Sequence, residues 1–126
     1  MANQLKVLYI DDEPEITEIV QAYFTSAGHH CVIENSAKEA INKAKSTSPD
    51  IILLDIKMPE ISGLEICSML KKDSDTADIP VILLSGKAGD YSVDEIYQCG
   101  CELLVKKPFS CERLMELVKP FTTGPQ

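Results

Sequence analysis

Acidic residues stand where two apolar runs of the sequence end. Residues 51–54 form an uninterrupted apolar run that ends at Asp55, and the largely apolar residues 5–10 lead into Asp11 and Asp12. Three carboxylates brought close together repel one another, and their pKa values rise unless a cation relieves them. Hard oxygen ligands favour Mg²⁺, which is usually held by one or two carboxylates and a phosphate oxygen. Because an aspartate is also a competent nucleophile toward phosphorus, this set suggests metal-assisted phosphoryl transfer.

Two further polar residues follow apolar runs and complete this chemistry. Ser85 comes after residues 80–84, and Lys107 comes shortly after residues 103–105. A metal ion, an ammonium group and a hydroxyl group can together neutralise the charge of a transferring phosphoryl group. We therefore assign Asp55 as the phosphoacceptor, with Ser85 and Lys107 beside the phosphoryl group.

Each of these residues, taken alone, also has a purely structural explanation. Asp55 could simply punctuate a strand, and the Asp11-Asp12 pair could complement a helix dipole. Ser85 could cap a helix, and Lys107 could be a solvated surface lysine. The argument for function therefore depends on whether the fold brings these residues together.

Apolar patterning predicts strands that alternate with helices. Runs without polar alternation are typical of strands that are buried on both faces. Strands are predicted at residues 5–10, 31–34, 51–54, 80–84 and 103–105. Helices are predicted from Pro14 to Gly28, from the Ser36/Glu39 capping pattern to before Pro49, from the Ser62/Glu65 pattern through Leu70, from the Ser92/Glu95 pattern to Gly100, and after the cap at Ser110.

Five strand–helix pairs of this length predict an α/β fold with one parallel sheet, right-handed crossovers and helices on both faces. The carboxyl ends of all its strands then share one edge, where ligand crevices form in open α/β sheets. That edge gathers a set of residues that are far apart in the sequence, namely Asp11, Asp12, Asp55, Ser85 and Lys107. Because five such residues meet at one edge, a shared functional role is favoured over five unrelated structural roles.

Length and charge limit the classes of function. The chain has 126 residues, of which 44% are hydrophobic, so it is expected to form one domain. A net charge of −8 argues against direct binding to nucleic acids or anionic membranes, and favours protein partners or a cation. No apolar run approaches membrane-spanning length, and the N-terminus lacks the plan of a signal peptide, so a cytoplasmic location is expected. Of the five cysteines only Cys99 and Cys101 are close, and their spacing favours reduced, partly buried thiols over a zinc site.

The polar motifs, in their order along the chain, resemble the receiver domain of two-component response regulators, of the single-domain chemotaxis or relay type. The motifs are Asp11-Asp12, Asp55-Ile56-Lys57-Met58-Pro59 with Gly63-Leu64-Glu65, Leu84-Ser85-Gly86 and Lys107-Pro108-Phe109. The similarity covers nearly the whole chain, which suggests a single receiver domain at 1–126 with a core at about 5–121 and a tail at 122–126.

The resemblance implies a fold and a set of ligands. The fold would be flavodoxin-like and doubly wound, with five parallel strands in the order 2-1-3-4-5, helices on both faces and a cis peptide bond before Pro108. Asp12 and Asp55 would coordinate Mg²⁺ together with the backbone carbonyl of Lys57, and Asp11 would act largely through water. Ser85 and Lys107 would contact the phosphoryl group.

The resemblance also implies the function and the partners. Asp55 would accept a phosphoryl group from a phosphohistidine on a sensor histidine kinase or a histidine phosphotransfer protein. The domain would then signal through non-covalent contacts with a downstream protein. It would not be an enzyme acting on a separate substrate, although it would assist its own phosphoryl transfer and autodephosphorylation. Because no effector domain follows Phe121, a stand-alone regulator or relay intermediate is expected, and a receiver excised from a longer protein is the alternative.

One position departs from the family pattern. Most receivers carry an aromatic residue three positions before the lysine, where this chain has Leu104. In the family that ring swings inward when the hydroxyl residue moves toward the phosphoryl group. The leucine leaves the phosphorylation chemistry unchanged, and we expect the output to depend on Ser85 and the loop after it.

Three other classes of protein are alternatives to a phosphorylated receiver. A flavodoxin-type cofactor binder would need a phosphate-binding loop rich in small residues after the first strand, where the acidic residues 11–13 would repel a phosphate. A phosphatase with an aspartate nucleophile usually has a second aspartate two residues later, and this chain has Lys57 there. The remaining alternative is an interaction module of receiver fold that works independently of phosphorylation.

Overall fold

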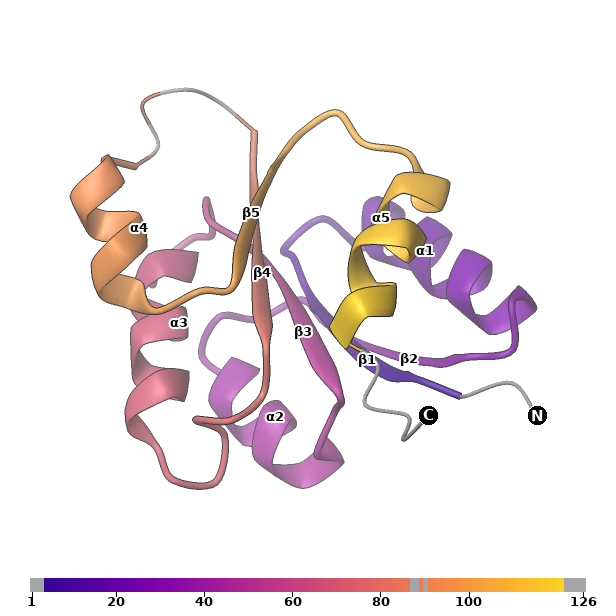
Figure 1. Ribbon diagram of the computed structural model, residues 1–126, viewed down its shortest axis with the longest axis horizontal. Coiled ribbons are helices and arrows are strands. Elements are labelled where there is room, and N and C mark those ends of the chain that lie inside the picture. The colour runs from indigo at the N-terminus through magenta and orange to yellow at the C-terminus, as the bar shows by residue number, and fades with distance from the viewer. Residues whose placement is uncertain (1–3, 87–88, 90, 122–126) are drawn as a thin grey trace.

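An open, five-stranded parallel sheet lies between two layers of helices in this computed structural model (Figure 1). The structure describes residues 4–86, 89 and 91–121, so the tail predicted at 122–126 lies outside the described residues. The strands are β1 (Lys6–Ile10), β2 (His30–Glu34), β3 (Ile51–Asp55), β4 (Val81–Ser85) and β5 (Leu103–Lys106). The helices are α1 (Pro14–Ser26), α2 (Ala40–Thr47), α3 (Gly63–Lys72), α4 (Val93–Cys99) and α5 (Cys111–Val118), followed by a 3₁₀ turn at Lys119–Phe121.

The strand order is β2-β1-β3-β4-β5, and all neighbouring strands are parallel. This confirms both the predicted α/β class and the order implied by the resemblance. The registers pair Ile10 with Leu54 and Asp55 with Leu84, so β1, β3 and β4 end at nearly the same level of the sheet. Residues that follow these strands therefore meet at one edge.

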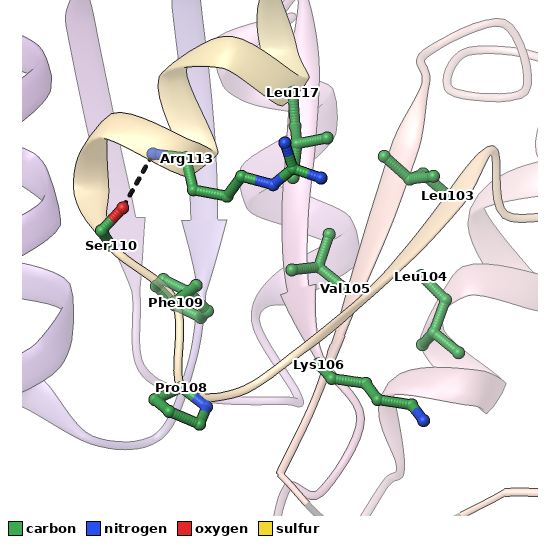
Figure 2. Close-up of a pocket in the computed structure, with 9 residues that line it drawn as sticks. All are labelled: Leu103, Leu104, Val105, Lys106, Pro108, Phe109, Ser110, Arg113 and Leu117. Atoms are coloured by element: carbon green, nitrogen blue, oxygen red, sulfur yellow. Dashed lines mark hydrogen bonds between the residues drawn. The ribbon is translucent and has the colours of Figure 1, made fainter.

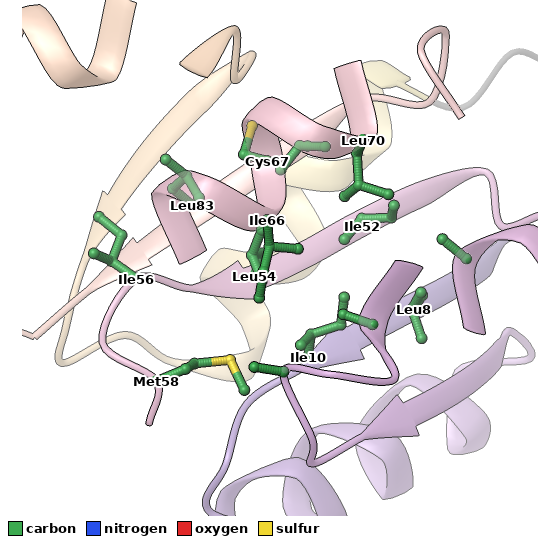
Figure 3. Packing of buried hydrophobic residues seen from close by; sticks show 14 of the residues in the cluster. Leu8, Ile10, Ile52, Leu54, Ile56, Met58, Ile66, Cys67, Leu70 and Leu83 are labelled. Atoms are coloured by element: carbon green, nitrogen blue, oxygen red, sulfur yellow. The ribbon is translucent and has the colours of Figure 1, made fainter. Parts of the chain in front are cut away.

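Helices α1 and α5 cover one face of the sheet, and α2, α3 and α4 cover the other (Figure 1). Alternation along β1 divides its side chains between two cores, because successive residues of a strand point to opposite faces. Leu8 and Ile10 pack beneath α2 and α3, whereas Val7 and Tyr9 pack beneath α1 and α5. Figure 3 shows the first of these cores, in which residues of β1 and β3 meet Ile66 and Leu70 of α3. The central strands are buried on both faces, which explains their uninterrupted apolar runs.

Three of the predicted helix caps are confirmed. The side chains of Ser62, Ser92 and Ser110 each accept a hydrogen bond from a backbone N–H of the first turn of α3, α4 and α5. At Ser92 the capping box is complete, because the Glu95 carboxylate also accepts a hydrogen bond from the Ser92 backbone N–H. Such a cap contributes about 1 kcal/mol to helix stability.

The capping box predicted at Ser36 and Glu39 is wrong. Helix α2 begins at Ala40, and its N-cap residue, Glu39, makes no side-chain capping bond. A turn precedes the helix, in which the Ser36 carbonyl accepts a hydrogen bond from the Glu39 N–H and the Ala37 carbonyl accepts one from the Ala40 N–H. Each of these hydrogen bonds joins residues that are three apart, so the chain winds more tightly here than in an α-helix. The Ser36 side chain therefore does not reach a capping position.

Within the described part of the chain, none of the helices combines the length and the apolar content that crossing a lipid bilayer requires.

Candidate functional site

Asp11 follows β1 directly, and its side chain is fully buried. Its Oδ1 accepts a hydrogen bond from the Glu13 backbone N–H at 3.1 Å, and its Oδ2 accepts one from the Tyr9 hydroxyl at 3.2 Å. The side-chain amide of Asn35 donates a hydrogen bond to the Asp11 carbonyl oxygen at 2.8 Å, which ties this loop to the segment after β2. The carboxylate of Asp11 is therefore held from both of its oxygens.

Asp55 ends β3, and the chain folds back tightly behind it to begin α3. The backbone N–H of Gly63 donates a hydrogen bond to the Ile56 carbonyl at 2.7 Å. A Cβ atom on Gly63 would lie 2.8 Å from the Ile56 Cα and would overlap the Asp55 carbonyl oxygen. Gly63 is the first residue of α3, directly after the cap at Ser62, and it has no positive φ. Its lack of a side chain allows the helix to pass directly against the backbone of the predicted phosphoacceptor.

Lys107 brings an ammonium group to the acidic residues. Its Nζ lies 3.3 Å from Asp55 Oδ1 and 3.5 Å from Asp11 Oδ2. The Lys107 backbone N–H donates a hydrogen bond to the carbonyl of Ser85 at 2.7 Å, and Ser85 itself is buried at the end of β4. The peptide bond between Lys107 and Pro108 is cis, as the resemblance implies.

The structure therefore brings the predicted residues to one edge of the sheet, with one qualification. Asp11, Asp12 and Asp55 each offer a carboxylate oxygen within 4.8 Å of the others. Lys57 lies two residues beyond Asp55 with an exposed side chain. Its backbone carbonyl as a metal ligand stays a prediction, and so do the roles assigned to the other residues.

Burial and charge alter proton binding at this site. Burial raises the pKa of Asp55 to about 6, and the Asp11 carboxylate adds to this rise while Lys107 opposes it. Burial lowers the pKa of Lys107, but the carboxylates of Asp55 and Asp11 outweigh burial, so the pKa of Lys107 is raised. Lys107 therefore remains a cation at neutral pH, whereas burial and the neighbouring Asp11 make the ionisation of Asp55 less favourable.

The raised pKa of Asp55 predicts a pH-dependent stability in the absence of metal. Its pKa rises from 3.8 to about 6 on folding, so the folded protein binds more protons than the unfolded chain between these values. The free energy of unfolding then falls as pH rises through this window. Asp55→Asn cannot ionise, so we expect its stability relative to the wild type to increase by about 1–2 kcal/mol across the window, a value reduced for screening by water.

Urea denaturation in EDTA, at several pH values between about 4 and about 7, measures this difference. Parallel stability curves for the two proteins over this range would contradict the electrostatic description of the site.

The three carboxylates fit a hard divalent cation. Mg²⁺ takes oxygen ligands at about 2.0–2.1 Å, so oxygens on opposite sides of the ion lie about 4 Å apart. The oxygens of Asp11, Asp12 and Asp55 already approach this spacing. A cation there would also relieve the repulsion that helps to raise the pKa of Asp55.

Two residues of the site were missed in the sequence, namely Tyr9 and Asn35. Tyr9 stands two residues before Asp11, and strand alternation places both side chains on the same face of β1. That spacing was a usable signal. Asn35 contacts the Asp11 carbonyl and the Thr17 hydroxyl only because β2 ends beside β1. No local pattern in the sequence indicates that Asn35 reaches Asp11.

Two grooves flank β5, which is an edge strand of the sheet. One lies between β5 and α5 and is lined by apolar residues such as Val105 and Leu117, and by Arg113 (Figure 2). The other lies between β5 and α4 and is lined by Tyr91, Ile96 and Tyr97, among others. Leu104 lines both grooves. The acidic residues and Lys107 line neither of these two grooves, so the site is separate from both.

The sequence is similar to a family of known proteins over most of its length. The family model described as the response regulator receiver domain matches residues 7–119. The polar-differentiation response regulator DivK of Brucella ovis is 33% identical over 115 residues, which are 91% of this chain and 94% of DivK. DivK of Brucella anthropi is 32% identical over the same share of both chains.

Solved structures agree with this result. The chemotaxis protein CheY4 of Vibrio cholerae superposes with a TM-score of 0.86 at 25% identity, covering 94% of this chain and 99% of CheY4. The receiver domain of a signal transduction histidine kinase from Syntrophus aciditrophicus gives a TM-score of 0.86 at 29% identity, covering 97% and 92%. The fold, the family match and the relatives lead to the same conclusion. The chain belongs to the family of response regulator receiver domains of two-component signalling.

Proposed function

We propose that this receiver domain is a phosphoacceptor in a two-component phosphorelay. Asp55 accepts a phosphoryl group from a phosphohistidine, and the phosphorylated domain signals through non-covalent contacts with a downstream protein. The observation that carries the proposal is the position of Lys107, whose ammonium lies within 3.5 Å of carboxylates from two different strands. An ammonium beside Asp55, next to carboxylates that can hold a divalent cation, suits phosphoryl transfer because catalysis of that reaction consists mainly of positioning and charge stabilisation.

Asp55 is suited to act as the nucleophile. With a pKa of about 6, its carboxylate is mostly ionised at neutral pH, and an ionised oxygen can attack phosphorus. As the new O–P bond forms, the N–P bond of the phosphohistidine breaks and the imidazole leaves with the bond's electron pair. Because Asp55 ends a buried strand and the backbone of α3 packs closely behind it, its carboxylate has little freedom to turn away.

The other residues stabilise the charge that develops on the phosphoryl oxygens. Lys107 donates from its ammonium group, and Ser85 donates from its hydroxyl group at the end of the neighbouring strand. Asp11, Asp12 and Asp55, with the Lys57 backbone carbonyl, would hold Mg²⁺, which when bound neutralises phosphoryl charge as a Lewis acid. The same groups would assist the later attack of water, and so autodephosphorylation.

The proposal extends to the partners and the setting. The phosphoryl donor is a sensor histidine kinase or a histidine phosphotransfer protein, and residues 1–126 act as a single cytoplasmic receiver domain. The curated relatives named above are response regulators, which supports this assignment. The net charge of −8 supports protein partners over nucleic acids.

Leu104 bears on how the output is produced. It stands where most receivers carry an aromatic residue, and it lines both grooves beside β5. Since a leucine has no ring to swing inward, we expect activation to shift Ser85 and the loop after it, with little change around Leu104. Crystal structures with and without beryllofluoride, a phosphoryl mimic, measure this directly. A large rearrangement centred on Leu104 would contradict the expectation.

Intact-protein mass spectrometry after incubation with acetyl phosphate tests the proposed function. We expect a gain of one phosphoryl group that requires Mg²⁺ and that hydroxylamine removes, because acyl phosphates are labile to hydroxylamine. The alternative, an interaction module that works independently of phosphorylation, predicts no gain with this donor or with a competent histidine kinase.

A further inference from the structure

Tyr9 reaches the acidic site from inside the protein. It lies on β1 and is fully buried in the core beneath α1 and α5, together with Phe24 and Leu114. Its hydroxyl group donates a hydrogen bond to Asp11 Oδ2 at 3.2 Å. Tyr9 lies on β1 and Asp11 directly follows this strand, so the two-residue spacing brings their side chains to the same side of the sheet, where the hydrogen bond joins them. The ring of Tyr9 therefore packs in the core while its hydroxyl group contacts the Asp11 carboxylate.

This hydrogen bond satisfies the Tyr9 hydroxyl group inside the core. A buried hydroxyl without a partner is unfavourable, and Asp11 satisfies this one. At 3.2 Å the bond is longer than most O–H···O hydrogen bonds, so its contribution lies in the direction that it gives the carboxylate.

The bond from Tyr9 also completes a two-point clamp on Asp11. The Glu13 backbone N–H donates to Oδ1 at 3.1 Å, and the Tyr9 hydroxyl donates to Oδ2 at 3.2 Å. The carboxylate cannot rotate about its Cβ–Cγ bond without breaking one of these bonds. Residues that hydrogen-bond to a metal ligand in this way orient the ligand and tune its affinity for the metal.

Lys107 is a second partner of the Asp11 oxygen to which Tyr9 donates. Its ammonium lies 3.5 Å from the same Asp11 oxygen and 3.3 Å from Asp55. With Tyr9 present, Oδ2 of Asp11 has a donor on the core side and shares Lys107 with Asp55. Without the hydroxyl, the Glu13 backbone N–H still holds Oδ1, but no hydrogen bond from Tyr9 opposes a turn of Oδ2 toward Lys107.

Building on the proposed Mg²⁺ site, we propose that Tyr9 is a positioning residue for the cation. Its hydroxyl group holds the Asp11 carboxylate in the orientation that lets Asp11, Asp12 and Asp55 bind one divalent ion together. Tyr9 does not touch the phosphoryl group, so its effect is on cation affinity and not on the transfer step itself.

Isothermal titration calorimetry with Mg²⁺ tests this role in Tyr9→Phe, which keeps the ring and removes only the hydroxyl. We expect the Kd for Mg²⁺ to weaken about 10-fold, the lower end of the effects seen for partners of metal ligands. The rate of phosphorylation by acetyl phosphate at saturating Mg²⁺ should stay within about twofold of the wild type, because ligand orientation is restored when the site is full.

Two control variants separate positioning from general effects. Tyr97→Phe removes an exposed hydroxyl on α4, and should leave the Kd for Mg²⁺ unchanged. Val7→Ala opens the same core beneath α1 and α5 without removing a contact to Asp11, so it tests loss of packing alone. Tyr9→Phe should also have no further effect on Mg²⁺ affinity when Asp11→Asn is already present, since coupled residues are not additive.

The outcomes distinguish this inference from the proposed function. If the wild type binds Mg²⁺ and Tyr9→Phe binds it within about twofold, or if Val7→Ala weakens binding equally, Tyr9 is not a positioning residue while the receiver mechanism stands. If the wild type binds no Mg²⁺ at all, both the proposed metal site and the role of Tyr9 are overturned.

Discussion

Gly63→Ala is expected to destabilise the protein by about 3 kcal/mol and to impair phosphorylation of Asp55 at the same time. The added Cβ would overlap the Asp55 carbonyl oxygen and would lie 2.8 Å from the Ile56 Cα. Both neighbours are backbone atoms, so no side chain can move aside to make room. Either α3 shifts outward, or the end of β3 moves and carries the Asp55 carboxylate away from Lys107.

Gly86→Ala is the matched control for this change. Gly86 lies at the same edge of the sheet, next to Ser85, but a Cβ there would meet nothing closer than the Lys107 Cδ, at 4.0 Å. We expect its free energy of unfolding, measured by urea denaturation, to lie within about 0.5 kcal/mol of the wild type. Equal stability of the two glycine variants would show that α3 does not depend on close approach to the phosphoacceptor strand.

Lys107→Met is expected to slow phosphorylation by about 10- to 100-fold at saturating Mg²⁺. Methionine retains most of the apolar length of the lysine but removes the ammonium that lies 3.3 Å from Asp55. The charge developing on the phosphoryl group then loses one of its stabilising donors. Asp55 and Asp11 also lose their ammonium partner, so stability in EDTA should fall, and Mg²⁺ should restore stability more fully than it restores the rate.

Lys106→Met is a close control because it changes the neighbouring lysine, which is exposed at the end of β5. Rates of phosphorylation by acetyl phosphate compare the two variants directly. If both variants are slowed equally, the effect of Lys107 is one of net charge and not of contact with Asp55. If neither is slowed, the ammonium has no part in the transfer.

The fold and the main site residues could be predicted from the sequence because both depend on local patterns. Uninterrupted apolar runs indicated buried parallel strands, and the polar residues that end those runs indicated the functional edge. The strand boundaries differ from the predicted ones by one residue at most of the strand ends, as at Ser85 and Lys106, which belong to β4 and β5. Serine caps were correct where the helix begins directly after the serine, as at Ser62 and Ser110.

Features that depend on contacts between distant segments were beyond the sequence. The turn after Ser36 is wound by backbone hydrogen bonds that the capping pattern does not reveal. The role of Gly63 depends on how closely α3 passes the end of β3, which the capping pattern at Ser62 does not reveal. The hydrogen bond from Asn35 to Asp11 depends on strand pairing in the folded sheet. In each case the sequence does not show how close the residues lie to one another in the folded protein.

The central claim is that Asp55 itself receives the phosphoryl group. Borohydride reduces an acyl phosphate to an alcohol, and so converts a phosphorylated aspartate into homoserine. We expect peptide mass spectrometry, after treatment with acetyl phosphate, Mg²⁺ and borohydride, to locate this conversion at Asp55 and to find it lost in EDTA. Conversion at Asp11 or Asp12, or none after treatment with a competent histidine kinase, would contradict the assignment of Asp55 as the phosphoacceptor.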